Sequence, residues 1–68
     1  MEYYQFFVDL WRLFKKHKEI AVNSEEYFAA LVEATDELIK KYQYRQLAID
    51  ITLAVVKELE RIAKRRMI

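Results

Sequence analysis

The chain has 68 residues, a formal net charge of +1, and no Gly, Pro or Cys. Without these residue types, tight hairpin turns, glycine-rich phosphate loops and cysteine-based metal or disulfide frameworks are excluded, which leaves helices joined by short polar links. A domain of this length buries only about 60% of its unfolded surface when it folds. We therefore expect oligomerisation or unusually dense packing to supply the stability that so small a core lacks. Hydrophobic residues make up 54% of the chain, which excludes a disordered protein.

The distribution of apolar residues predicts the location of the protein. No apolar run approaches the roughly 18 residues that a membrane span requires. Glu2 and Asp9 interrupt the apolar N-terminal segment, so no signal peptide is expected. The sequence therefore predicts a cytoplasmic protein without a membrane span.

Residues 2–18 are predicted to form the first helix. Polar residues recur at intervals of three and four, which places them on one narrow stripe: Glu2, Gln5, Asp9, Arg12 and Lys16. The remaining apolar arc is roughly 220° wide, whereas a surface helix needs little more than 100°. The first helix therefore carries more apolar surface than one contact can cover.

Residues 24–42 are predicted to form the second helix. Asn23 or Ser24 can cap its first amides. Its apolar arc spans roughly 160°, which is typical of a helix packed against two neighbours. On its polar face, Glu37 and Lys41 are spaced for a favourable ion pair.

Residues 44–66 are predicted to form the third helix. Its main apolar stripe contains Tyr44, Leu47, Ile51, Ala54, Val55, Leu59 and Ile62. Residues 41–45 contain no strong helix breaker, so one continuous second helix is the alternative. We favour a turn because the apolar stripe of residues 24–42 does not continue at helical spacing through residues 41–45. The predicted fold is an all-α, up-down-up bundle of three helices in a single domain, residues 1–68.

The surplus apolar residues of the first and third helices predict an interaction surface. They are Tyr4, Val8, Trp11, Ile49, Leu53 and Val56. If these residues stay exposed to water, we expect them to form one contiguous apolar patch of the kind that marks interfaces. A two-fold homodimer is the simplest way to bury it, and a foreign protein partner is the alternative.

The basic residues near the helix ends have two interpretations. They are Lys15, Lys16, Lys18, Arg61, Lys64, Arg65 and Arg66. Cations at helix C-termini complement the helix dipole without any ligand, and we favour this interpretation. Because the first and third helices end on the same side of an up-down-up bundle, the residues can also merge into an anion-binding or nucleic-acid-binding patch.

Neither the histidine nor the acidic residues form a recognisable catalytic or metal-binding pattern. His17 lies on the apolar side of the first helix and has no second histidine to share a metal. Glu33, Asp36 and Glu37 lie on the most solvated face, whereas catalytic carboxylates need a dry cleft. We therefore expect a non-enzyme with no catalytic residue, cofactor, metal or small-molecule substrate.

Four segments of the chain resemble a known group of proteins. They are Phe14-Lys15-Lys16, Asn23-Ser24-Glu25-Glu26-Tyr27, Lys40-Lys41-Tyr42 and Glu58-Leu59-Glu60-Arg61. In this order they resemble uncharacterised small helical proteins encoded in prophages and mobile elements of Gram-positive bacteria. The resemblance implies a helical fold and a mobile-element origin, and it transfers no activity and no functional residue. The sequence as a whole predicts a protein-interaction module, with a nucleic-acid-binding accessory protein as the alternative.

Overall fold

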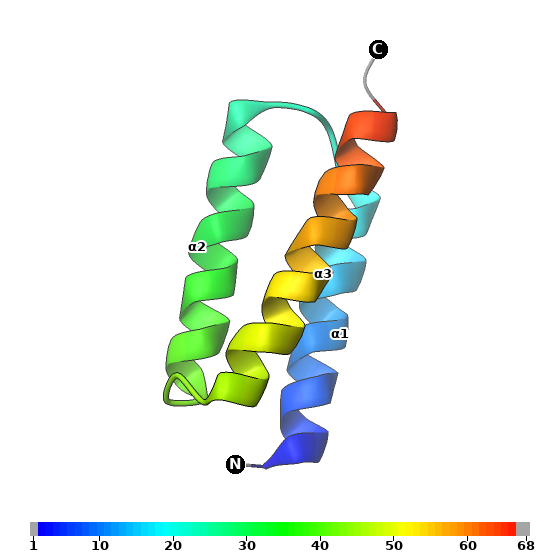
Figure 1. The fold of residues 1–68 in the computed structure, drawn as a ribbon. Coiled ribbons are helices and arrows are strands. Elements are labelled where there is room, and N and C mark those ends of the chain that lie inside the picture. The colour runs from blue at the N-terminus through cyan, green and yellow to red at the C-terminus, as the bar shows by residue number, and fades with distance from the viewer. Residues whose placement is uncertain (1, 67–68) are drawn as a thin grey trace.

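The computed structural model describes residues 2–66, which form three helices and no strand. The helices are α1 (Tyr3–Glu19), α2 (Glu25–Lys41) and α3 (Gln46–Arg65). They pack side by side, with α1 and α3 running in one direction and α2 in the other (Figure 1). The predicted three-helix bundle is confirmed, and each predicted boundary lies within two residues of the observed one.

The connection between α1 and α2 ends in a side-chain cap. The backbone of Ser24 is extended, and its hydroxyl oxygen accepts a hydrogen bond from the Tyr27 amide at 3.2 Å. This bond satisfies one of the free amides at the start of α2. Ser24, one of the two predicted candidates, is therefore the N-cap.

The connection between α2 and α3 is a tight turn built without glycine. Gln43 and Tyr44 both have positive φ angles, 58° and 57°. The Tyr44 amide donates to the Ile39 carbonyl at 3.0 Å and the Gln43 amide to the Lys40 carbonyl at 2.9 Å. These bonds form the Schellman motif that commonly ends a helix. The predicted turn is thus confirmed, although side chains with a Cβ occupy its left-handed positions.

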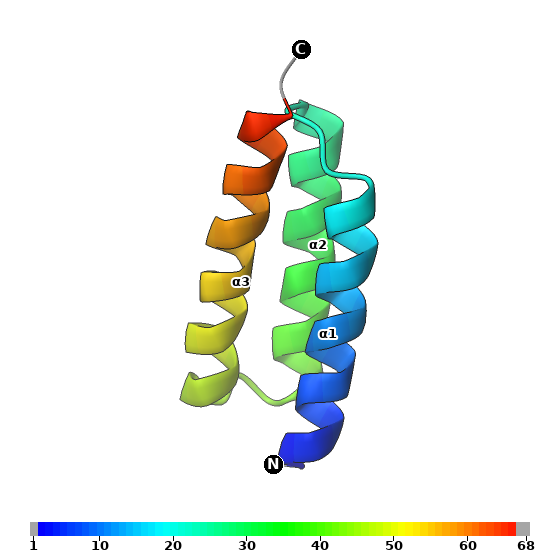
Figure 2. The same cartoon turned by 90° about the vertical axis from the view of Figure 1, so that its right-hand side faces the viewer.

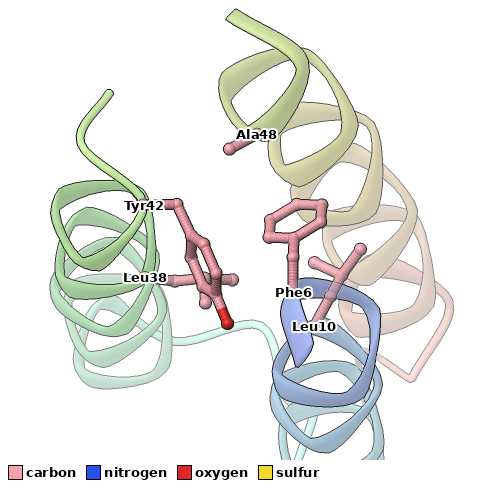
Figure 3. Packing of buried hydrophobic residues seen from close by; sticks show 5 residues of the cluster. All are labelled: Phe6, Leu10, Leu38, Tyr42 and Ala48. Carbon is pink, nitrogen blue, oxygen red and sulfur yellow. The ribbon is translucent and has the colours of Figure 1, made fainter. Parts of the chain in front are cut away.

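Two clusters of buried side chains fill the space between the helices. The cluster at one end consists of Phe6, Leu10, Leu38, Tyr42 and Ala48, drawn in Figure 3. Within it, the rings of Phe6 and Tyr42 meet edge to face with centroids 5.1 Å apart. The cluster at the other end consists of Ala21, Tyr27, Leu31, Leu59 and Ala63. All three helices contribute to the interior, so each one is held by the other two.

The buried face of α3 differs from the stripe that the sequence predicted. Its buried residues are Ala48, Thr52, Leu59 and Ala63. Tyr44, Leu47 and Ala54 were assigned to the main apolar stripe and are exposed. The prediction was wrong at these positions because helical periodicity shows which residues share a face but not which face meets the neighbouring helices. The outer side of α3 consequently keeps a row of apolar residues that the bundle does not cover.

Candidate interaction surface

An apolar groove lies between α1 and α3. These two helices form the side of the bundle that points away from α2 (Figure 2). The groove is lined by Phe7, Leu10, Trp11, Phe14 and Val55, and we call it the α1–α3 groove. The Phe7 side chain is 47% exposed and that of Trp11, the only tryptophan, is 59% exposed. The Trp11 and Phe14 rings lie 6.0 Å apart. Large aromatic side chains therefore face solvent along this side of the molecule.

The groove becomes charged toward the C-terminal ends of both helices. There its lining consists of Phe14, Lys18, Glu58, Ile62, Arg65 and Arg66. The Lys18 ammonium lies 5.9 Å from the centre of the Phe14 ring, within the range of a cation–π contact. The Arg66 guanidinium donates a hydrogen bond to the Lys18 carbonyl at 2.9 Å. The apolar and charged stretches share Phe14 and are parts of one surface.

The predicted basic residues lie together at this end of the bundle. All seven are exposed: Lys15, Lys16, Lys18, Arg61, Lys64, Arg65 and Arg66. Carboxylates lie among them, because Glu58 is 2.8 Å from Arg61 and 3.6 Å from Arg65. The first turn of α2, which lies at the same end, adds Glu25 and Glu26. The end of the bundle therefore carries interleaved charges of both signs.

The structure does not bring the predicted interaction residues together in one patch. Trp11 lines the α1–α3 groove, while on the same helix Tyr4 is exposed and Val8 is half-buried. On α3, Ile49, Leu53 and Val56 have the spacing of a helical row that continues to Glu60 and Lys64. Those two residues line a different groove, together with Phe28 and Val32 of α2.

The two sets lie on opposite flanks of α3 because α1 and α2 pack on neighbouring sides of that helix. The expectation of one contiguous patch is therefore corrected. The sequence did not indicate that Phe7 is exposed, or that the half-buried Phe14 and Val55 line the groove beside it. The spacing of Phe7, Trp11 and Phe14 signals one helical row, which groups these aromatic side chains without any structure.

A polar contact closes the other flank of α1 against α2. The Asp9 carboxylate accepts hydrogen bonds from Lys41 at 2.8 Å, from the Tyr42 hydroxyl at 2.5 Å and from Gln5 at 3.1 Å. The bonds from Lys41 and then Tyr42 lower the pKa of Asp9 to about 2. Burial, and then the bond to Asp9, raise the pKa of Tyr42 to about 12. Lys41 thus pairs with Asp9 of another helix. The sequence had instead predicted that Lys41 pairs with Glu37 of its own helix.

His17 has a structural environment. Its side chain is buried, and its Nδ1 atom lies 2.9 Å from the Leu13 carbonyl oxygen. The Tyr27 hydroxyl donates to the His17 carbonyl at 2.8 Å, which joins the end of α1 to α2. Glu33, Asp36 and Glu37 are exposed on α2.

Within residues 2–66 no group of three or more metal-binding side chains is gathered. In that part of the chain, none of the helices has the length and apolar character needed to cross a membrane.

Comparisons of the chain with protein-family models, with curated proteins and with solved structures found no significant match.

Proposed function

We propose that this protein acts without catalysis, through protein–protein interaction at the α1–α3 groove, and that it associates with itself there. The observation that carries the proposal is the exposure of Phe7 and Trp11 beside Val55. Aromatic side chains supply most of the binding energy in many interfaces, and Trp is among the most enriched residues at such positions. An exposed aromatic cluster of this kind is typical of a surface that another protein covers.

The dimensions of the molecule suit one such interface. A specific complex commonly removes about 800 Å² of surface from each partner. That area is about a sixth of the 5006 Å² that the chain exposes. Because the molecule is 40 Å long and 18 Å wide, one long face supplies an area of this size. The α1–α3 side is large enough to support stable association.

Sedimentation equilibrium at tens of micromolar tests the proposal. We expect the wild type to associate, and the double variant Phe7→Glu plus Trp11→Glu to remain a folded monomer. A matched control is Val32→Glu plus Leu53→Glu on the other flank of α3. These two residues are 55% and 48% exposed, close to the values for Trp11 and Phe7. The control adds the same charge and should still associate.

Two results would contradict the proposal. One is a wild type that stays monomeric. The other is association that survives in the groove variant and disappears in the control. Circular dichroism of each variant shows whether its helices are intact, so that unfolding is not mistaken for dissociation.

The alternative proposal is nucleic-acid binding by the basic helix ends. It is supported by the Arg66–Lys18 hydrogen bond, which joins the basic segments of α1 and α3. It is opposed by Glu58, which neutralises part of Arg61 and Arg65. Phosphate binding would appear as affinity for random duplex DNA that falls steeply with salt. We expect no such binding. A cytoplasmic location and an origin in a mobile element stay predictions.

A further inference from the structure

We propose that the turn between α2 and α3 is a hinge through which two copies of this chain exchange α3. In the exchanged form residues 25–65 become one straight helix, and α3 of each copy fills the place that α3 of the other copy has left. This inference goes beyond the proposed function, because the exchanged contacts lie in the interior of the bundle and not in the α1–α3 groove.

The hinge residues hold a backbone conformation that suits glycine better than the residues present. Gln43 and Tyr44 have φ angles of 58° and 57°, both in the left-handed region. A Cβ atom crowds the backbone there, so residues other than glycine gain free energy when they move to the right-handed helical region. The turn therefore stores strain that a straight helix releases.

The local sequence also favours a straight helix. Residues 40–48 contain no Gly, Pro or β-branched residue, and most of them are good helix formers. Within the described residues 2–66 the N-cap residue of α3, Arg45, makes no capping hydrogen bond with its side chain. In a straight helix the amides of residues 46–48 bond to the carbonyls of residues 42–44. Straightening thus pairs backbone groups that no cap of this kind satisfies in the turn.

The interior does little to hold the turn. Tyr44 is 63% exposed, and Gln43, Arg45 and Gln46 are exposed as well. Tyr42 is buried against the interior, but it precedes the hinge, so α2 keeps this contact when the turn straightens. Few side-chain contacts are therefore lost when the hinge opens.

The buried side chains of α2 and α3 are spaced as on one continuous helix. A single series with alternating intervals of four and three residues consists of Leu31, Thr35, Leu38, Tyr42, Arg45, Ile49, Thr52, Val56, Leu59 and Ala63. All of them are buried or half-buried except Arg45, where the turn interrupts the apolar series. This is the spacing of helices that pack along their full length. In a straight helix the interior sides of α2 and α3 therefore form one seam.

The arrangement of the helices identifies the partner as a second copy. In the single chain α2 and α3 run antiparallel (Figure 1). Two straight helices related by a perpendicular two-fold axis are antiparallel as well, so α3 of each copy lies along α2 of the other. The interior is packed around Ala48, Thr52, Leu59 and Ala63. A helix with other side chains would leave cavities or clash there, whereas the same helix from a second copy restores every contact.

Exchange differs from association at the groove in its kinetics. Because α3 has to leave the interior, the exchanged dimer forms and dissociates only as fast as the bundle unfolds. During folding in dilute solution the turn closes before a second copy arrives, whereas refolding at millimolar concentration lets the second copy compete. The exchanged dimer then persists after dilution, unlike a groove complex in rapid equilibrium.

A matched pair of hinge variants tests the inference. Gln43→Gly plus Tyr44→Gly suits the left-handed turn, and Gln43→Ala plus Tyr44→Ala suits the straight helix. The pairs differ only by two methyl groups, and both also carry Phe7→Glu and Trp11→Glu, so that the groove does not contribute. After refolding at millimolar concentration we expect the alanine pair to dimerise. The dissociation constant of the glycine pair should be at least about a hundredfold higher.

Mass and length are measured together, by light scattering after gel filtration and by small-angle X-ray scattering. The single chain is 40 Å long, whereas a straight helix over residues 25–65 is about 60 Å long. The exchanged dimer should therefore be clearly longer, while intact bundles packed side by side add width instead. The wild-type turn with the same groove substitutions should lie between the two pairs, and it replaces the alanine pair in the comparison if circular dichroism shows that pair to be unfolded.

Three results would overturn the inference. They are an alanine pair that folds and stays monomeric, equal dimer fractions for the alanine and glycine pairs, and a dimer no longer than the single chain. None of them bears on the proposed function, which is tested by reversible association of the wild type on dilution.

Discussion

Phe6 and Phe7 are adjacent residues of α1 with the same side chain and opposite environments. Phe6 has no exposed surface and touches Tyr42, the C-cap of α2, whereas Phe7 is 47% exposed beside Trp11. The difference arises because two neighbouring helices cover only part of the wide apolar arc of α1. The interior holds the bundle together, and part of the remaining arc stays exposed to solvent. The comparison separates residues needed for folding from residues available for binding.

The most direct way to break this comparison is to truncate each phenylalanine. Phe6→Ala should lower the free energy of unfolding by about 3–5 kcal/mol, because it leaves a cavity among buried side chains. Phe7→Ala should change the stability of the monomer much less and weaken association instead. Thermal melts at a concentration below that of association provide the measurement. Equal losses for both variants would contradict the division into interior and binding surface.

The second cluster extends the comparison to the other end of the bundle. Leu31 and Leu59 are almost fully buried in it, and Leu10 belongs to the first cluster. Replacement of any of these leucines by alanine should cost about 2–5 kcal/mol. Glu33→Ala, two positions from Leu31 but exposed, should cost less than about 0.5 kcal/mol. Chemical denaturation of Leu31→Ala beside Glu33→Ala checks the assignment, which fails if the two are equally mild.

The interior has one position where a gain in stability is expected. The Thr52 hydroxyl is fully buried and, among residues 2–66, has no hydrogen-bond partner. Thr52→Val keeps the shape and removes the unpaired polar atom, so it should raise the free energy of unfolding by about 1–2 kcal/mol. Thr52→Ser, which keeps the hydroxyl and loses a methyl group, should lower it. Denaturant midpoints show whether each variant is more or less stable than the wild type, and a less stable Thr52→Val would contradict the prediction.

The flank of α1 that faces α2 is expected to be sensitive to acid through Asp9. Since the pKa of Asp9 falls from 3.8 to about 2 on folding, its contribution is fully present above the unfolded value and disappears as the pH drops through about 2. This contribution is about 1 kcal/mol after allowance for solvent screening. The wild type should lose stability between these two pKa values, and Asp9→Asn should lose less there. Urea titrations at stepped pH values measure the difference, and parallel profiles would show that the contact contributes nothing.

The helices were predictable from the sequence because local signals mark them. Polar stripes at helical spacing and the Ser24 cap are local features, and they placed every boundary within two residues. The buried face of α3 was not predictable in the same way, since Ala48 and Thr52 are buried by how closely the helices approach. That distance is a property of the assembled bundle.

The candidate surface was predictable only in part. The excess apolar arc of α1 indicated an exposed apolar face, and Trp11 lies on it. The choice of Ile49, Leu53 and Val56 as its other half required knowledge of how α3 is rotated between α1 and α2. Val55, predicted for the interior, packs against both buried clusters and also lines the groove. Helical periodicity defines which residues share a row, but it does not define which row faces which neighbour.

The emission spectrum of Trp11, followed as the protein is diluted, tests the central claim most directly. It is the only tryptophan, it lies in the α1–α3 groove, and it is 59% exposed in the single chain. If the groove is the interface, emission shifts to shorter wavelength as concentration rises, in step with the mass measured by sedimentation. A doubled mass with unchanged, solvent-exposed emission would contradict the account, because association would then use a different surface.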